Sequence, residues 1–168
     1  MITIPNLGLR FQDGVYWTIG VSFLLTLISF VNKNVKDPIL REIKKKEEQL
    51  SFFHYIELYV IRFLHYISTI YIVFLPYMFK PELWMYIIYE IYLFGAVLSW
   101  YLVKECPFTI KEKQILDPKY VNGNTNLQPF MALFVPNNIY LFVFTTIYSI
   151  NFSLISYNLF TAFFSNLS

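Results

Sequence analysis

The chain has 168 residues, of which 57% are hydrophobic and only 14% are charged, and its formal net charge is +2. Soluble domains have roughly 45–50% apolar and about 25% charged residues, so we expect an integral membrane protein, because a soluble fold of this size cannot bury so much apolar surface. The small net charge, without a basic patch interleaved with stacking aromatics, argues against nucleic-acid binding, and a single cysteine excludes an intramolecular disulfide.

The first apolar stretch runs from Val15 to Val31 and is the shortest of four. A helix needs ~20 residues to cross ~30 Å of hydrocarbon, so this segment spans a membrane only if Asp13 and Asn32 lie close to its ends. The residues before it resemble neither a secretory signal nor a transit peptide. Targeting is therefore expected to depend on the apolar segment itself.

A lysine-rich segment follows this first stretch. From residue 38 to 51 we expect an amphipathic helix on the inner membrane surface, because Pro38 suits a first helical turn and apolar residues recur near helical spacing. Its lysines would face anionic headgroups. We therefore count Lys44, Lys45 and Lys46 as candidate contacts to a partner or to headgroups.

The second and third apolar stretches, Tyr55–Phe79 and Leu83–Val103, are separated only by the turn at residues 80–82. We expect them to form an antiparallel helical hairpin. An ionisable group at the centre of a bilayer costs at least ~2.5–3.5 kcal/mol, so those within the hairpin are candidate intramembrane polar contacts. They are Glu57, Arg62, His65 and Glu90.

These four residues have different expected roles. Arg62 is expected to snorkel to inner headgroups or to pair with Glu57, with binding of a lipid phosphate or a partner carboxylate as the alternative. His65 raises the question of haem ligation. The other histidine, His54, lies on the same segment, so one chain cannot supply two facing axial ligands, and no cofactor is expected.

Glu90 is expected opposite about Ile72 in the hairpin, ~15 Å in height from Arg62, which argues against a direct pair. Its carboxyl would then be protonated, hydrated, or paired with another subunit or with tyrosine hydroxyls. A packing or assembly contact is the favoured interpretation, and proton transfer is the alternative.

A polar loop occupies residues 104–128. Pro107 cannot extend the third helix, and Thr109 with Glu112 fits a capping box that would start a short helix at about Ile110–Leu116. Cys106 is expected to be a structural thiol, with S-acylation or redox chemistry as alternatives. The candidate partner or headgroup contacts of this loop are Cys106, Lys111 and Lys113.

The loop also carries a family resemblance. Trp100 to Gly123 follow the pattern W-x3-K-E-C-P-F-T-x2-E-K-x2-L-D-P-x-Y-x2-G. This resembles the Cys-Pro-x-Ser/Thr…Glu-Lys…Asp/Asn-Pro-x-Tyr loop of small, uncharacterised multi-span membrane proteins of giant DNA viruses. The resemblance covers about 25 of 168 residues. It implies a virion inner membrane or an infected-cell membrane, with no known activity to transfer.

The fourth apolar stretch, about Phe130–Ile150, is followed by an uncharged tail at residues 151–168. One helix from Phe130 to Phe164 would be ~52 Å long, too long for a bilayer without a break, and we expect that break at residues 136–138. The tail would extend the fourth segment, lie at the outer interface or return as a fifth span.

The sequence therefore predicts an all-α, polytopic membrane protein with about four transmembrane helices. The loops after the first and third stretches hold ten Lys and Arg residues, whereas the opposite side holds only Arg10 and Lys80. The positive-inside rule then predicts that both termini lie outside and both large loops inside, in a host or virion membrane if the viral resemblance holds.

The sequence contains none of the common catalytic or nucleotide-binding motifs. We expect a non-enzymatic structural or assembly component without a cofactor or metal, whose basic inner loops contact a protein partner and which could form a homo-oligomer. The alternative is an accessory subunit of a respiratory-type organellar complex. A transporter or membrane enzyme that uses Glu90 and Arg62 is less well supported, because the sequence has no internal repeat.

Overall fold

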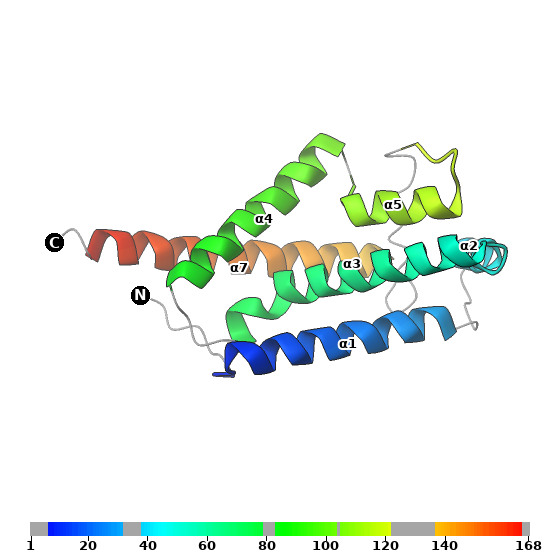
Figure 1. Ribbon diagram of the computed structural model, residues 1–168. Helices are drawn as coiled ribbons and strands as arrows, with labels where there is room; N and C mark the ends of the chain where they lie inside the picture. The colour runs from blue at the N-terminus through cyan, green and yellow to red at the C-terminus, as the bar shows by residue number, and fades with distance from the viewer. Residues whose placement is uncertain (1–6, 32–37, 79–82, 104, 122–136, 166–168) are drawn as a thin grey trace.

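The computed structural model describes residues 7–31, 38–78, 83–103, 105–121 and 137–165, and the regular elements in these ranges are helices. They are α1 (Phe11–Val31), α2 (Pro38–Glu48), α3 (Phe52–Met78), α4 (Leu83–Val103), α5 (Pro107–Leu116) and α7 (Asn137–Ser165). The all-α class expected from the sequence is confirmed. The long helices α1, α3, α4 and α7 run alternately in opposite directions, so α1 begins and α7 ends at one end of the bundle (Figure 1). The short helices α2 and α5 lie at the other end.

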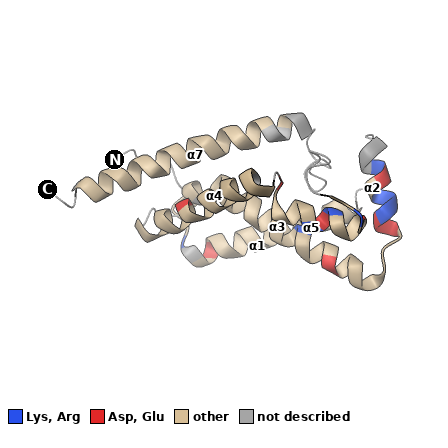
Figure 2. Cartoon of the chain, turned by 90° about the horizontal axis from the view of Figure 1, so that it is seen from above, with Lys and Arg blue, Asp and Glu red and all other residues tan. Residues whose placement is uncertain are grey.

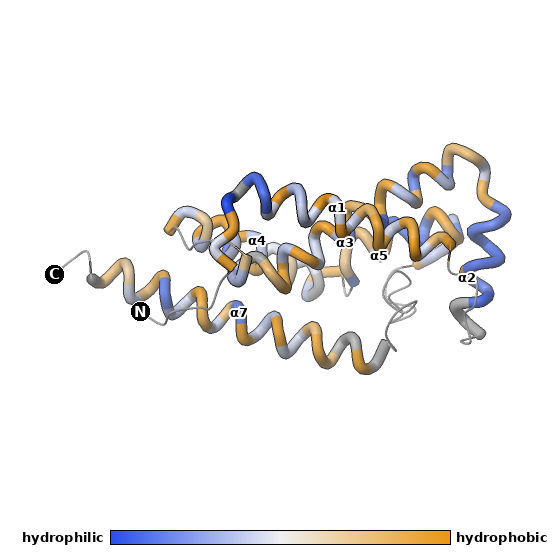
Figure 3. Tube along the Cα trace, turned by 90° about the horizontal axis from the view of Figure 1, so that it is seen from below, coloured by the Kyte–Doolittle hydropathy of each residue, from blue (hydrophilic) through white to orange (hydrophobic). Residues whose placement is uncertain are grey.

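Among the described residues, three helices are long and apolar enough to cross a membrane. The candidate spans are Gln12–Val31, Phe52–Phe74 and Leu83–Val103. Large apolar side chains such as Leu24 on α1 and Ile91 on α4 point outward and are 58% and 68% exposed, which suits a hydrocarbon surrounding and not water. Figure 3 shows the contrast with α2, whose course is mostly hydrophilic.

The fourth long helix, α7, is uncharged and 29 residues long. Its start at Asn137 falls at the break expected around residues 136–138, while the expected earlier part of the segment, from Phe130, lies outside the described residues. The helix continues without interruption to Ser165, so residues 151–165 extend the fourth segment.

Helix α1 packs against α3 along a stripe of small polar side chains. Thr18, Ser22, Thr26 and Ser29 are fully buried and recur every three or four residues after Gly14. Small side chains let two membrane helices approach closely. The Thr18 and Thr26 hydroxyls donate to carbonyls one turn earlier, at 2.8 and 2.7 Å, so these two hydroxyls need no other partner within the bundle.

Helix α3 contains Pro76 within its last turns. Proline has no N–H, so the carbonyl of Ile72 loses its helical hydrogen-bond donor. Two side chains replace it: the Tyr89 hydroxyl of α4 donates to this carbonyl, and Asn151 Nδ2 of α7 donates to it at 3.0 Å. Asn151 Nδ2 also lies 3.1 Å from the Val73 carbonyl. We call Ile72, Pro76, Tyr89 and Asn151 the proline clamp, and it joins α3, α4 and α7.

Candidate functional site

Helices α2 and α5 form a charged cap at one end of the bundle, where most of the charged residues on the described helices gather (Figure 2). Helix α5 runs back along the first half of α3. Near its start, Cys106 Sγ lies 3.4 Å from His65 Nε2, and one turn later Lys111 Nζ lies 2.8 Å from Glu57 Oε1. At the end of α5, Asp117 lies 3.4 Å from Lys46 of α2. The cap is therefore folded onto α3.

The start of α5 differs from the expectation. The helix begins at Pro107, with Cys106 as an extended N-cap and without a side-chain capping hydrogen bond. The predicted capping box of Thr109 and Glu112 is therefore wrong, because both residues lie inside the helix and are fully buried. Proline has its φ angle preset for a helix and leaves no N–H to satisfy, so it suits the first turn without a capping side chain. The predicted end of the helix at Leu116 is confirmed.

Arg62 of α3 lies at the centre of the cap. Its fully buried side chain donates from Nε to Glu112 of α5 at 2.6 Å and from Nη2 to Glu47 of α2 at 2.5 Å. Lys44 of α2 donates to the other carboxylate oxygen of Glu47 at 2.9 Å. We call Lys44, Glu47, Arg62 and Glu112 the ion-pair cluster. Two cations meet two carboxylates, so the charge within the α3 span is neutralised by side chains from two helices outside the candidate spans.

The structure corrects the expectation that Arg62 snorkels to headgroups or pairs with Glu57. Arg62 is 0% exposed, and Glu57 instead pairs with Lys111 at the edge of the cap, where both side chains are nearly half exposed. Residues five apart on a helix point about 140° away from each other. Glu57 and Arg62 therefore meet different neighbours.

Burial controls the electrostatics of the cluster. It raises the pKa of Glu112, although the charge of Arg62 opposes this shift. It lowers the pKa of Lys44 against the attraction of Glu47. Both shifts favour the uncharged form, as expected where water is excluded. Within the described part of the chain, Arg62 Nη1 and Glu112 Oε2 are buried without a hydrogen-bond partner. The cluster therefore leaves one donor atom and one acceptor atom without a hydrogen bond.

A second buried pair closes the loop that contains α5. Lys113 Nζ lies 2.8 Å from Glu105 Oε1, and the Tyr120 hydroxyl donates to the same carboxylate at 2.6 Å. Glu105 lies before α5 and Tyr120 after it. These contacts make residues 105–120 a folded unit.

The six candidate partner or headgroup contacts therefore have different positions. Lys113 is 8% and Lys44 11% exposed, and both are engaged in ion pairs, so the expectation that they reach outward is wrong. Cys106 is half-buried beside His65, and burial raises the pKa of its thiol. Lys45 is exposed, and Lys46 and Lys111 are partly exposed at 38% and 48%.

Glu90 and His65 lie outside the ion-pair cluster. The Glu90 carboxylate accepts a hydrogen bond from Ser156 of α7, a partner that the sequence did not suggest. The expected depth of Glu90 agrees with the structure, because the adjacent Tyr89 reaches the Ile72 carbonyl. The His65 ring lies 5.4 Å from the ring of Phe108 on α5. Within the described ranges, no group of three or more His, Cys, Asp or Glu is placed to hold a metal ion.

The sequence did not identify Glu47 in the ion-pair cluster or Asn151 in the proline clamp. It identified Glu112 only as a capping residue and not as a counter-charge to Arg62. An arginine within a span requires a carboxylate, and an internal proline requires a donor for the carbonyl four residues earlier. Those two needs were visible in the sequence, but the residues that meet them were not. No protein-family model, curated protein or solved structure matches the chain. Its function is therefore inferred from its own geometry.

Proposed function

We propose that the chain is a non-enzymatic, multi-pass membrane protein that acts as a structural or assembly component, and that its charged cap contacts a protein partner at the inner membrane surface. The observation that carries this proposal is the docking of α2 and α5 onto α3 through the ion-pair cluster. Surface charges held on a folded cap have defined positions, which favours recognition of a specific partner over loose attraction to any anion.

The proposal includes α7 as a fourth span. The helix is uncharged, and its Asn151 and Ser156 side chains hydrogen-bond to α3 and α4. Such contacts are typical of helix packing within a bilayer. With four spans, α1 begins and α7 ends on the same side, and the distribution of ten Lys and Arg residues against two supports an outer location for that side.

The exposed cations of the cap define the partner that we expect. The Lys45 and Lys119 side chains are exposed on α2 and after α5, and neither is part of the buried pairs. Lys46 and Lys111 are partly exposed on the same cap, and they form ion pairs with Asp117 and Glu57, respectively. An acidic protein segment complements this surface. The resemblance of residues 100–123 to viral proteins adds a virion or infected-cell membrane as the proposed location.

The test is crosslinking of the full chain in its native membrane. The double variant Lys45→Glu/Lys119→Glu reverses two exposed charges of the cap, and Arg10→Glu reverses one exposed charge at the opposite end as a control. We expect the cap variant to lose its protein crosslinks by roughly tenfold, equivalent to about 1.4 kcal/mol, while Arg10→Glu retains them. Equal crosslinking of all three proteins would contradict the proposal.

Topology requires a separate measurement. In a Cys106→Ser background, single cysteines at Lys45 and Lys119 should be labelled by an impermeant reagent only from the inner side, and a cysteine at Arg10 only from the outer side. Labelling of the cap and of Arg10 from one side would exclude four spans. Co-purification with many subunits and haem would favour the accessory subunit of a respiratory-type complex.

A further inference from the structure

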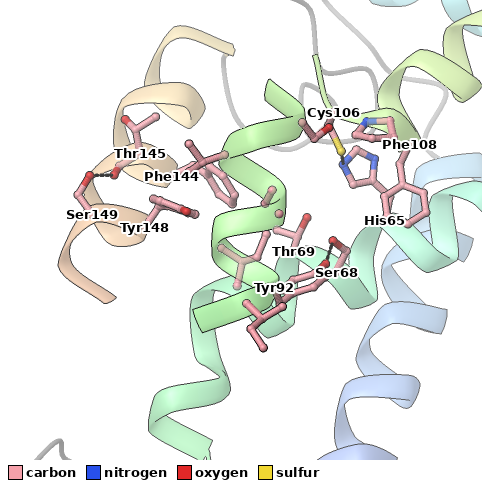
Figure 4. Close-up of a pocket in the computed structure, with 17 residues that line it drawn as sticks. His65, Ser68, Thr69, Tyr92, Cys106, Phe108, Phe144, Thr145, Tyr148 and Ser149 are labelled. Atoms are coloured by element: carbon pink, nitrogen blue, oxygen red, sulfur yellow. Dashed lines mark hydrogen bonds between the residues drawn. The ribbon is translucent and has the colours of Figure 1, made fainter. Parts of the chain in front are cut away.

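A cavity of about 580 Å³ lies between α3, α4 and α7, and the first turn of α5 borders one end of it (Figure 4). Its walls include Ile72 of α3, Gly95 of α4 and Phe144 of α7, and Cys106 and Phe108 lie at the α5 end. Sites for small ligands occupy ~300–1,000 Å³. The cavity is therefore large enough for a ligand.

The cavity lies at membrane depth. Its α3 wall, residues 65–72, belongs to the candidate span Phe52–Phe74, and its α4 wall, residues 91–99, belongs to the candidate span Leu83–Val103. Molecules that reach it therefore come from the hydrocarbon region of the bilayer. The most abundant molecules of the bilayer are phospholipids, and their acyl chains fill the hydrocarbon region.

The chemistry of the walls also suits an acyl chain. Several lining hydroxyls are engaged within the protein: Ser68 bonds to the Tyr92 hydroxyl, and Ser149 donates to the Thr145 carbonyl at 2.9 Å. These groups do not attract a polar ligand, whereas a hydrocarbon chain needs no hydrogen bond.

Ser99 differs from these two serines, and its position is informative. Its hydroxyl oxygen is buried and has no hydrogen-bond partner among the described residues. It lies one turn before the end of α4, at the same end of the cavity as Cys106. That end adjoins the charged cap, where the interface of the bilayer and the ester carbonyls of its lipids are expected. Rotation of the Ser99 side chain toward the cavity would let its hydroxyl donate to an ester carbonyl.

The space arises beside a small residue of α4. A Cβ atom added at Gly95 would meet no atom within 4 Å, so no close helix contact requires glycine there. Helix α4 also runs obliquely away from α3 toward its C-terminal end (Figure 1). A ligand in this space would contact all three helices on the cap side of the proline clamp, which joins them.

We propose that this cavity binds one acyl chain of a membrane phospholipid, with the ester end beside Ser99 and Cys106 and the terminal methyl group toward Ile72. The lipid fills the space between α4 and the two helices α3 and α7. This inference goes beyond the proposed function, because it requires membrane insertion but no protein partner.

The test compares two glycines that both face open space. Gly95→Phe fills the cavity, and Gly20→Phe adds the same ring on α1, where a Cβ atom also meets no atom within 4 Å. Each full-length variant is reconstituted in nanodiscs of phosphatidylcholine and phosphatidylglycerol, extracted in mild detergent and analysed by native mass spectrometry. We expect the unmodified protein and Gly20→Phe to retain one phospholipid, and Gly95→Phe to retain it roughly tenfold less, equivalent to about 1.4 kcal/mol.

A second variant keeps the test decisive if Gly95→Phe misfolds. Ser149→Phe fills the cavity from the α7 wall and decides the outcome if Gly95→Phe loses helical circular dichroism. Undiminished retention in a folded filling variant overturns the proposal, as does a retained ligand whose mass is not that of a phospholipid. An acyl mass that survives denaturation and disappears in Cys106→Ser also overturns it, because the occupant would then be covalently attached.

Discussion

The ion-pair cluster and the proline clamp meet the same requirement at two depths of α3. In the cluster, the Arg62 guanidinium needs a counter-charge, and carboxylates of α2 and α5 supply it. In the clamp, the Ile72 carbonyl lacks a donor, and the neutral side chains of Tyr89 and Asn151 supply one. Each is a polar group on a membrane helix that cannot be left without a partner.

The difference between the two regions follows from what each partner costs to bury. A charge is neutralised only by another charge, and a lone carboxylate within hydrocarbon is expensive. Glu47 and Glu112 lie on short helices outside the candidate spans and reach Arg62 from there. A carbonyl needs only an O–H or N–H group, which a neutral residue can carry on a spanning helix. The cap is therefore held by charge and the bundle by neutral hydrogen bonds.

The largest effect is expected from Arg62→Met. This change leaves Glu112 buried without its ion-pair partner and Glu47 with Lys44 alone, which should lower the free energy of unfolding by about 3–5 kcal/mol. The measurement is denaturant unfolding in mixed micelles, together with limited proteolysis between α2 and α3. Undocking of the cap should speed cleavage of this segment, because its ends would no longer be held by the docked helices.

A triple variant provides the matched control for this prediction. In Arg62→Met/Glu47→Leu/Glu112→Leu, the guanidinium and both carboxylates are replaced by apolar side chains, which is often close to neutral for stability, and Lys44 keeps the Ser29 carbonyl as its acceptor. Most of the lost stability should therefore return. If Arg62→Met alone were as stable as the unmodified chain, the cluster would not hold the cap.

A smaller loss is expected in the clamp. Asn151→Leu keeps a side chain of similar size but removes the donor to the Ile72 and Val73 carbonyls, which should lower the free energy of unfolding by about 1–2 kcal/mol. Ser153→Leu, at an exposed position of the same helix, is the control and should change little. Equal losses in both variants would show that the clamp carbonyls do not depend on Asn151.

The pH dependence sharpens the comparison, because the cluster, unlike the clamp, contains a carboxyl group, that of Glu112, which is buried outside the candidate spans. Burial raises the pKa of Glu112 in the folded state, so its contribution to stability is fully present below the unfolded pKa of about 4.3 and is lost as pH rises through the raised value. The stability of the unmodified chain relative to Glu112→Gln should therefore decrease as pH rises from 4 toward neutrality. A relative stability that increases over this range would show that Arg62 outweighs burial.

The smallest effect is expected at the rim of the cap. The Lys111–Glu57 pair is nearly half exposed on both sides, so Lys111→Ala should lower the free energy of unfolding by at most ~1 kcal/mol, because water screens the pair. Added salt should reduce even this difference. A loss as large as that of Arg62→Met would mean that the rim and the buried cluster contribute equally to docking.

Much of the fold follows from local sequence. The apolar runs predicted α1, α3 and α4 to within four residues at each end, because helical length and apolarity are local properties. Prolines marked other boundaries: α2 begins at Pro38, and α4 ends four residues before Pro107. The expected start of α5 was wrong because Pro107 itself occupies the first turn.

The sequence by itself therefore determined an all-helical chain of apolar segments with its charges concentrated in two short helices. Only the tertiary structure decided which charges meet. Arg62 and Glu112 are 50 positions apart, and Asn151 and Ile72 are 79 apart. No local spacing pairs residues at such separations. Their meeting depends on how α5 folds back on α3 and on which face α7 turns toward α3, and these are properties of the packed bundle.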